Sequence, residues 1–138
     1  HDLKREDMIY IRSSCNLKYL SIKNPYEVIY CRDALDKTEV FNIVHLENDT
    51  VSIRSFAGKY LSLKVQNKNV LIADADTISS TEKFLLQVLE EGDNRFTLRA
   101  CNGKFVSVMD NKNQLLAAGS VTESVRETFR LYILHRTR

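Results

Sequence analysis

The sequence predicts an all-β protein of one domain, and three observations lead to this class. First, three stretches of the chain, residues 8–50, 51–94 and 95–138, align with one another along their whole length. Second, apolar and polar residues alternate in short runs within each stretch, which is typical of strands with one buried face. Third, no stretch carries a helical apolar stripe longer than a turn or two. We therefore expect strands to supply nearly all of the regular structure.

The composition supports a single folded domain. The chain has 138 residues, of which 43% are hydrophobic and 28% are charged, and it contains four glycines and one proline. These values exclude collagen, coiled coils and intrinsic disorder. No apolar run approaches the roughly 18 residues of a membrane-spanning helix. We expect an N-terminal tail over residues 1–7 and one domain over residues 8–138.

The first two strands of each stretch are expected to form a hairpin. The first strand carries two alternating apolar residues followed by an arginine: Ile9, Ile11 and Arg12; Val51, Ile53 and Arg54; Phe96, Leu98 and Arg99. A tight turn follows, Ala57-Gly58-Lys59 in the second stretch and Asn102-Gly103-Lys104 in the third. Asn-Gly strongly favours a hairpin because both residues tolerate a positive φ angle. The second strand alternates in the same way, at Leu20 and Ile22, Leu61 and Leu63, and Val106 and Val108.

The third and fourth strands complete each stretch. The third strand is short and apolar, over residues 28–31, 70–73 and 115–118. A glutamate and then a phenylalanine mark the start of the fourth strand: Glu39 and Phe41, Glu82 and Phe84, Glu127 and Phe129. We interpret the three glutamates as structural residues rather than catalytic ones.

Twelve strands in three like units predict a closed structure. One unit of four strands cannot bury its apolar face alone, whereas three units can close around a common axis. Closure also removes the exposed strand edges that favour aggregation. The predicted fold is therefore a β-trefoil, with three four-stranded repeats around a pseudo-threefold axis.

The turn and the fourth-strand motif also resemble those of a known family. The segments Val51–Ser62 (VSIRSFAGKYLS) and Phe96–Ser107 (FTLRACNGKFVS), with Thr81-Glu82-Lys83-Phe84, are similar to units of the fascin-like β-trefoils of the actin-crosslinking group. The first stretch departs from this pattern, because Asn16-Leu17 stands where glycine is expected. The resemblance implies a protein that binds or crosslinks actin filaments.

The charge distribution places a candidate binding surface in the last third of the chain. The net charge is only +2, which does not predict specific nucleic-acid binding, but residues 95–138 carry eight basic and three acidic side chains. The residues that we expect to contact an anionic partner are Lys59, Arg99, Lys104, Lys112, Arg126 and Arg130. An actin filament, an anionic membrane surface or another polyanion would each be attracted by such a patch. Charge alone does not distinguish these partners.

No motif for catalysis, a cofactor or a metal is present, so we expect a binding protein and not an enzyme. The three cysteines, Cys15, Cys31 and Cys101, have no metal-ligand spacing and favour a reducing compartment, hence the cytoplasm and its cytoskeleton. The sequon at Asn48 favours the alternative of a secreted ligand or protease inhibitor. A carbohydrate-binding trefoil is a further alternative, although the chain lacks tryptophan, an aromatic platform used by lectins.

Overall fold

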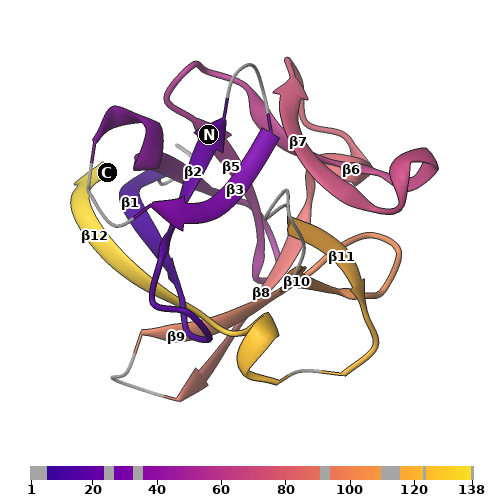
Figure 1. Ribbon diagram of the computed structural model, residues 1–138. Helices are drawn as coiled ribbons and strands as arrows, with labels where there is room; N and C mark the ends of the chain where they lie inside the picture. The colour runs from indigo at the N-terminus through magenta and orange to yellow at the C-terminus, as the bar shows by residue number, and fades with distance from the viewer. Residues whose placement is uncertain are drawn as a thin grey trace.

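The computed structural model describes residues 6–23, 27–32, 36–90, 94–109, 116–122 and 124–137. These residues form twelve strands and four single-turn 3-10 helices (Figure 1). The strands are β1 (Glu6–Ser13), β2 (Tyr19–Lys23), β3 (Glu27–Arg32), β4 (Phe41–His45), β5 (Thr50–Ser55), β6 (Tyr60–Lys64), β7 (Val70–Ala75), β8 (Phe84–Glu90), β9 (Arg95–Arg99), β10 (Phe105–Val108), β11 (Leu116–Ser120) and β12 (Phe129–Thr137). The helices are η1 (Lys37–Glu39), η2 (Val65–Asn67), η3 (Ser80–Glu82) and η4 (Val125–Glu127). The predicted all-β class is confirmed.

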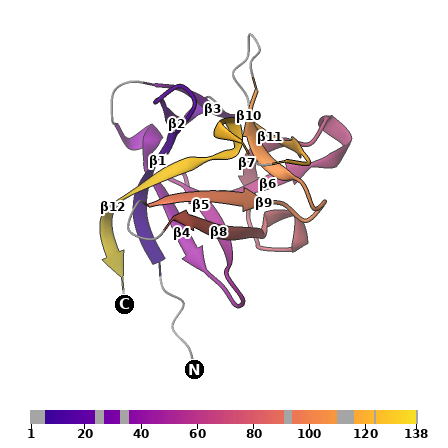
Figure 2. The same cartoon turned by 90° about the horizontal axis from the view of Figure 1, so that it is seen from below.

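A closed barrel forms one layer of the molecule. Strands β1, β4, β5, β8, β9 and β12 pair in that order, and β12 pairs back with β1, all of them antiparallel. Figure 2 shows these strands below the other six. Closure leaves no free edge along the ring, as the sequence predicts.

Three hairpins form the second layer. They are β2–β3, β6–β7 and β10–β11, and they are joined to one another through β3–β7 and β7–β11 pairs. Each hairpin is tied to the barrel by a cross-strand pair between an arginine and an aromatic residue: Arg12 with Tyr19, Arg54 with Tyr60, and Arg99 with Phe105. These three pairs become important for the outer surface.

The core lies between the barrel and the hairpins. Its largest fully buried side chains include four phenylalanines, Phe41, Phe84, Phe96 and Phe129, which begin or lie within barrel strands. Alternate residues of each strand point inward, so Ile9 and Ile11 are fully buried while Met8 is exposed. Burial of these apolar side chains is the main source of stability.

Buried glutamates attach the helices to the hairpins. Glu39, Glu82 and Glu127 end η1, η3 and η4, and their exposed fractions are only 0%, 4% and 4%. Each carboxylate accepts a hydrogen bond from a serine of the facing hairpin: Ser21 at 2.6 Å, Ser62 at 2.6 Å and Ser107 at 2.5 Å. Each also closes a capping box at its own helix. These contacts are of the structural kind that the sequence predicts for the three glutamates.

Two local features differ from the expected pattern. Strand β1 begins at Glu6, inside the expected tail, because Glu6 and Asp7 pair with Val44 and Ile43 of β4. In the first turn, Leu17 adopts a φ of 62°, where the later turns use Gly58 and Gly103 at 85° and 82°. Across the described residues, no helix is long and apolar enough to span a membrane.

Candidate functional site

The outer face of the barrel carries three rows of side chains, each crossing three neighbouring strands. Residues opposite each other in an antiparallel pair point to the same side of the sheet, so the strand register defines the rows. We name them the arginine row (Arg95, Arg130, Arg12), the Glu6 row (Met8, Asn42, Arg54) and the Leu85 row (Thr50, Leu85, Arg99). The Glu6 row takes its name from the carboxylate that binds its arginine. None of these nine side chains is buried, in agreement with their outward direction.

Every row ends on an arginine that stacks over an aromatic ring. The guanidinium carbon lies 5.3 Å from the Tyr19 ring centre for Arg12, 5.9 Å from that of Tyr60 for Arg54, and 4.5 Å from that of Phe105 for Arg99. A cation over an aromatic face is attracted by the ring's quadrupole. The contact holds each guanidinium against the barrel and leaves the N–H groups along its edge free to point away from the ring.

The Glu6 row is completed by a carboxylate from the same chain. Glu6 Oε1 lies 2.6 Å from Arg54 Nη2 and accepts a second, longer hydrogen bond of 3.3 Å from Asn42 Nδ2. Burial raises the pKa of the Glu6 carboxyl, but the hydrogen bonds from Arg54 and Asn42 outweigh this effect and lower the pKa below its usual value. The cation of this row is therefore neutralised within the molecule.

The arginine row brings together three guanidinium groups from β9, β12 and β1. Neighbouring strands lie about 4.8 Å apart, so the three side chains start from adjacent positions on one face. Arg12 Nε donates a hydrogen bond of 2.8 Å to the backbone oxygen of Leu17, which fixes one end of the row. The row thus places three guanidinium groups at adjacent positions across the barrel.

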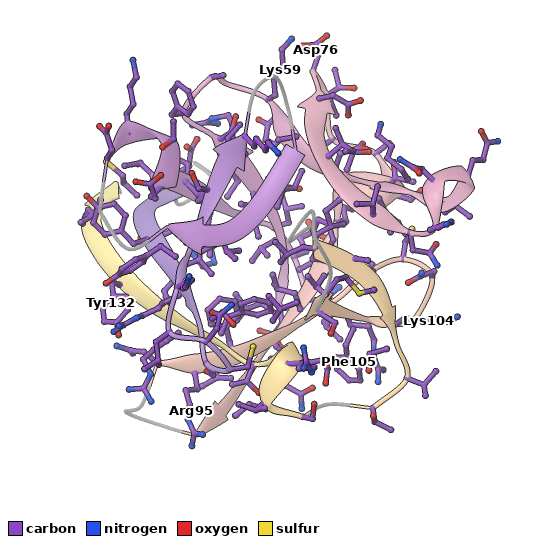
Figure 3. All side chains as sticks on the ribbon, viewed as in Figure 1. Lys59, Asp76, Arg95, Lys104, Phe105 and Tyr132 are labelled. Atoms are coloured by element: carbon purple, nitrogen blue, oxygen red, sulfur yellow. The ribbon has the colours of Figure 1, made fainter. Side chains whose placement is uncertain are left out.

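A cluster of three tyrosines borders the arginine row. Tyr10 and Tyr132 are opposite each other in the β1–β12 pair, and Tyr19 packs against both, with ring centres 6.0 Å and 6.3 Å away. In Figure 3 Tyr132 lies at the left of the molecule and Arg95 at the bottom. All three tyrosines are half-buried, and together with the row they offer rings, hydroxyl groups and cations to a partner.

Comparison with known proteins assigns the family. The model of the FRG1-like domain matches residues 19–131, which is most of the chain. The chain belongs to the FRG1-like domain family. No curated protein matches this FRG1-like sequence.

Solved structures with the same fold are β-trefoil proteins. The designed threefold-symmetric protein ThreeFoil is similar with a TM-score of 0.77 and 16% identity, over 90% of this chain and 96% of its own. A Polyporus squamosus lectin bound to an influenza-binding epitope has a TM-score of 0.76 and 19% identity, over 96% of this chain and 51% of its own. SeviL bound to asialo-GM1 saccharide has a TM-score of 0.75 and 11% identity, over 94% of this chain and 98% of its own. The FRG1-like chain therefore spans about half of the Polyporus lectin, and at these identities the likeness shows the fold alone.

The predicted binding residues of this FRG1-like domain do not form one patch. Lys59, in the β5–β6 turn, forms an ion pair with Asp76, and Figure 3 shows this pair on a different side of the molecule from Lys104 and Arg95. Arg99 and Lys104 share the β9–β10 hairpin, Arg126 is exposed on η4, and Arg130 lies in the arginine row. Lys112 lies outside the described residues. Lys59 is thus set apart, whereas the described predicted residues of the last stretch lie on elements that contact one another, β9 with β12 and β10 with η4.

Arg12 was not among the predicted binding residues, and Arg95 was expected only as one of the basic residues of the last stretch. Arg12 belongs to the first stretch, which has no basic excess, and Arg95 is brought next to Arg130 only by the pairing of β9 with β12. The available signal was the recurrence of an arginine at the end of each first strand. It marks Arg12, Arg54 and Arg99 but does not show which strands lie beside them.

A hollow of about 560 Å³ lies beside the β6–β7 hairpin. Leu63, Val65, Ile72 and Thr81 line it, together with Lys64, which forms an ion pair of 2.8 Å with Asp74. Among the described residues, its lining contains no aromatic side chain that could stack on a sugar ring. Within the described ranges, no three His, Cys, Asp or Glu side chains are grouped as metal ligands would be.

Proposed function

We propose that this FRG1-like domain is a non-catalytic module that binds actin filaments through the arginine row. The observation that carries the proposal is the placement of Arg95, Arg130 and Arg12 side by side on three strands, next to the tyrosine cluster. Actin filaments are acidic, and a band of guanidinium groups increases the association rate and orients such a partner. The sequence resemblance to fascin-like units supports the same partner, and with it a place in the cytoplasmic cytoskeleton.

The proposal includes a β-trefoil of three equivalent lobes. Three recurrences support equivalence: the serine–glutamate contact, the capping box and the arginine stacked on an aromatic ring each occur once in every stretch. In such a fold the lobes share a buried framework and differ in their outer side chains. One lobe boundary, between β12 and β1, would then form the filament-binding face.

Co-sedimentation with actin filaments tests the proposal. The double variant Arg95→Ala/Arg130→Ala removes two of the three cations, and we expect filament affinity to fall about ten-fold at low salt. The control is Lys68→Ala/Lys83→Ala, which removes the same charge from exposed positions away from the row and should leave affinity within about two-fold. Binding of the wild type should weaken as salt is raised.

Two results would reject filament binding by this face. One is a wild-type domain that remains in the supernatant at low and moderate salt. The other is a double variant that sediments like the wild type. Vesicles that contain an anionic lipid, and heparin as a soluble polyanion, serve as comparison ligands, because both attract cations without offering an actin surface.

Carbohydrate binding is the second candidate function. It is favoured by the fold shared with the Polyporus squamosus lectin and with SeviL, whose structures contain bound sugars. The tyrosine cluster supplies aromatic rings and hydroxyl groups, which suit a sugar. A glycan array tests this candidate, and Tyr132→Ala should then abolish any signal.

A further inference from the structure

The Glu6 row contains an arginine that is stacked on an aromatic ring and bound to a carboxylate. Arg54 stacks on Tyr60 and donates a hydrogen bond of 2.6 Å to a carboxylate oxygen of Glu6. The neighbouring position of the row, Asn42, adds a second donor to the same oxygen. A stacked arginine at the end of a row is thus a carboxylate site in this fold, and the molecule itself contains an occupied example.

The Leu85 row repeats the arginine and the ring but not the carboxylate. Glu6 lies two residues before Met8, and the strand register makes Thr50 the counterpart of Met8. The residue two positions before Thr50 is Asn48, in a tight turn where Asn48 and Asp49 have φ angles of 58° and 61° and Thr50 N donates to Glu47 O. The chain turns back at this point, so no counterpart of Glu6 extends along the row.

Arg99 is consequently held in place with its polar edge facing solvent. It lies 4.5 Å from the Phe105 ring centre, the closest of the three stacked pairs, and Phe105 is only 5% exposed. Arg99 itself is exposed and, among the described residues, forms no ion pair with a carboxylate. The ring fixes the guanidinium in advance, which lowers the entropy that a ligand would otherwise have to offset.

The neighbouring position of this row sets a second property of the ligand. Leu85 occupies the place that Asn42 has in the Glu6 row, and it is 41% exposed. An apolar side chain beside a guanidinium suits a ligand that carries an apolar group next to its negative group. A free small anion would leave Leu85 uncovered.

We propose that Arg99, Phe105 and Leu85 form a binding site for an acidic protein segment, in which a carboxylate side chain pairs with Arg99 and an adjacent apolar side chain covers Leu85. The site is separate from the arginine row. Arg99 pairs with Leu85 across β8 and β9, whereas Arg12 pairs with Arg130 across β1 and β12. It therefore does not depend on the proposed filament contact.

Nuclear magnetic resonance titration of the full chain tests the site. The probe is an acetylated and amidated peptide of alternating glutamate and leucine, and the control peptide has glutamine in place of glutamate. We expect saturable shifts of the Arg99 Nε–H and Leu85 methyl signals with the first peptide, and at least about ten-fold weaker binding of the second. Equal binding of the two peptides would overturn the proposal.

Three variants locate the binding and test its basis. Arg99→Gln should weaken binding of the acidic peptide, followed at the Leu85 methyl signals, about ten-fold or more, whereas Lys68→Gln, at an exposed position outside the three rows, should leave that affinity within about two-fold. Glu6→Gln should free Arg54 and create a second saturable site, seen at the Arg54 Nε–H signal. Unchanged affinity in Arg99→Gln, an equal loss of affinity in Lys68→Gln, or no new site in Glu6→Gln would each contradict the assignment.

Discussion

The buried glutamates and the outer-face arginines both recur three times, but they have diverged to different degrees. Glu39, Glu82 and Glu127 keep the same partners, a hairpin serine and a capping box, in all three stretches. The three outer rows keep only the arginine and its stacked ring, and their middle positions carry arginine, asparagine and leucine. A buried carboxylate without its donors is costly, whereas an exposed row can exchange its members at little cost in stability. The interior thus preserves the fold while each outer row can take a different partner.

Removal of the Glu82 charge should cause the largest loss in the free energy of unfolding. Glu82 accepts hydrogen bonds of 2.6 to 2.8 Å from Ser62, from Thr81, and from both the hydroxyl and the backbone N–H of Ser79. In Glu82→Gln one acceptor oxygen becomes an NH₂ group that faces donors. We expect a loss of about 2–4 kcal/mol in the free energy of unfolding, measured by urea denaturation.

The matched control for this change is Glu47→Gln. Glu47 lies exposed in the β4–β5 turn, so the same chemical substitution should alter stability by less than about 0.5 kcal/mol. Equal losses in the two variants would mean that the buried network does not hold the hairpin to the barrel.

The parts of the fold that depend on local pattern could be predicted from the sequence. Alternating apolar residues identified the strands, and the recurring glutamate before a phenylalanine identified the start of β4, β8 and β12. The turn at Leu17 was less predictable, because the sequence offers no glycine there and the backbone nevertheless adopts a positive φ. Tertiary contacts of the hairpin override the local preference at that position.

The candidate site depends on information that the sequence does not carry. Arg12 and Arg130 become neighbours through the pairing of the first strand with the last, and their register follows from barrel closure. Lys59 was expected at the binding surface from its turn position, but its charge is paired with Asp76. Composition locates basic residues along the chain, whereas strand order decides which of them face a partner together.

Acid titration sharpens the contrast between the buried and exposed carboxylates. Burial raises the pKa of Glu82, but the hydrogen bonds from Ser62, Ser79 and Thr81 outweigh it and lower the pKa to about 2, from an ordinary value of 4.5. Because the folded-state pKa is depressed, this carboxylate stabilises the protein above pH 4.5, and the contribution is lost as the pH falls from about 5 towards 2. The shift corresponds to roughly 3 kcal/mol.

The measurement is the free energy of unfolding as a function of pH for the wild type and Glu82→Gln. The wild-type curve should fall more steeply between pH 5 and pH 2, since the variant has already lost the group that titrates. Parallel curves would show that Glu82 is not the residue that links acid to unfolding.

The smallest expected changes in the free energy of unfolding distinguish the Glu6 row from the Leu85 row. Arg54→Ala breaks both the ring contact and the ion pair with Glu6, so we expect a loss of about 1–2 kcal/mol in the free energy of unfolding. Arg99→Ala breaks only the contact with Phe105, for which we expect about 0.5–1 kcal/mol. A double-mutant cycle with Glu6→Ala should give a coupling energy of about 0.5–1 kcal/mol with Arg54 and none with Arg99. Coupling of Glu6 to Arg99 would instead show that the two rows interact. Arg99 would then not be the stacked arginine that lacks a carboxylate partner.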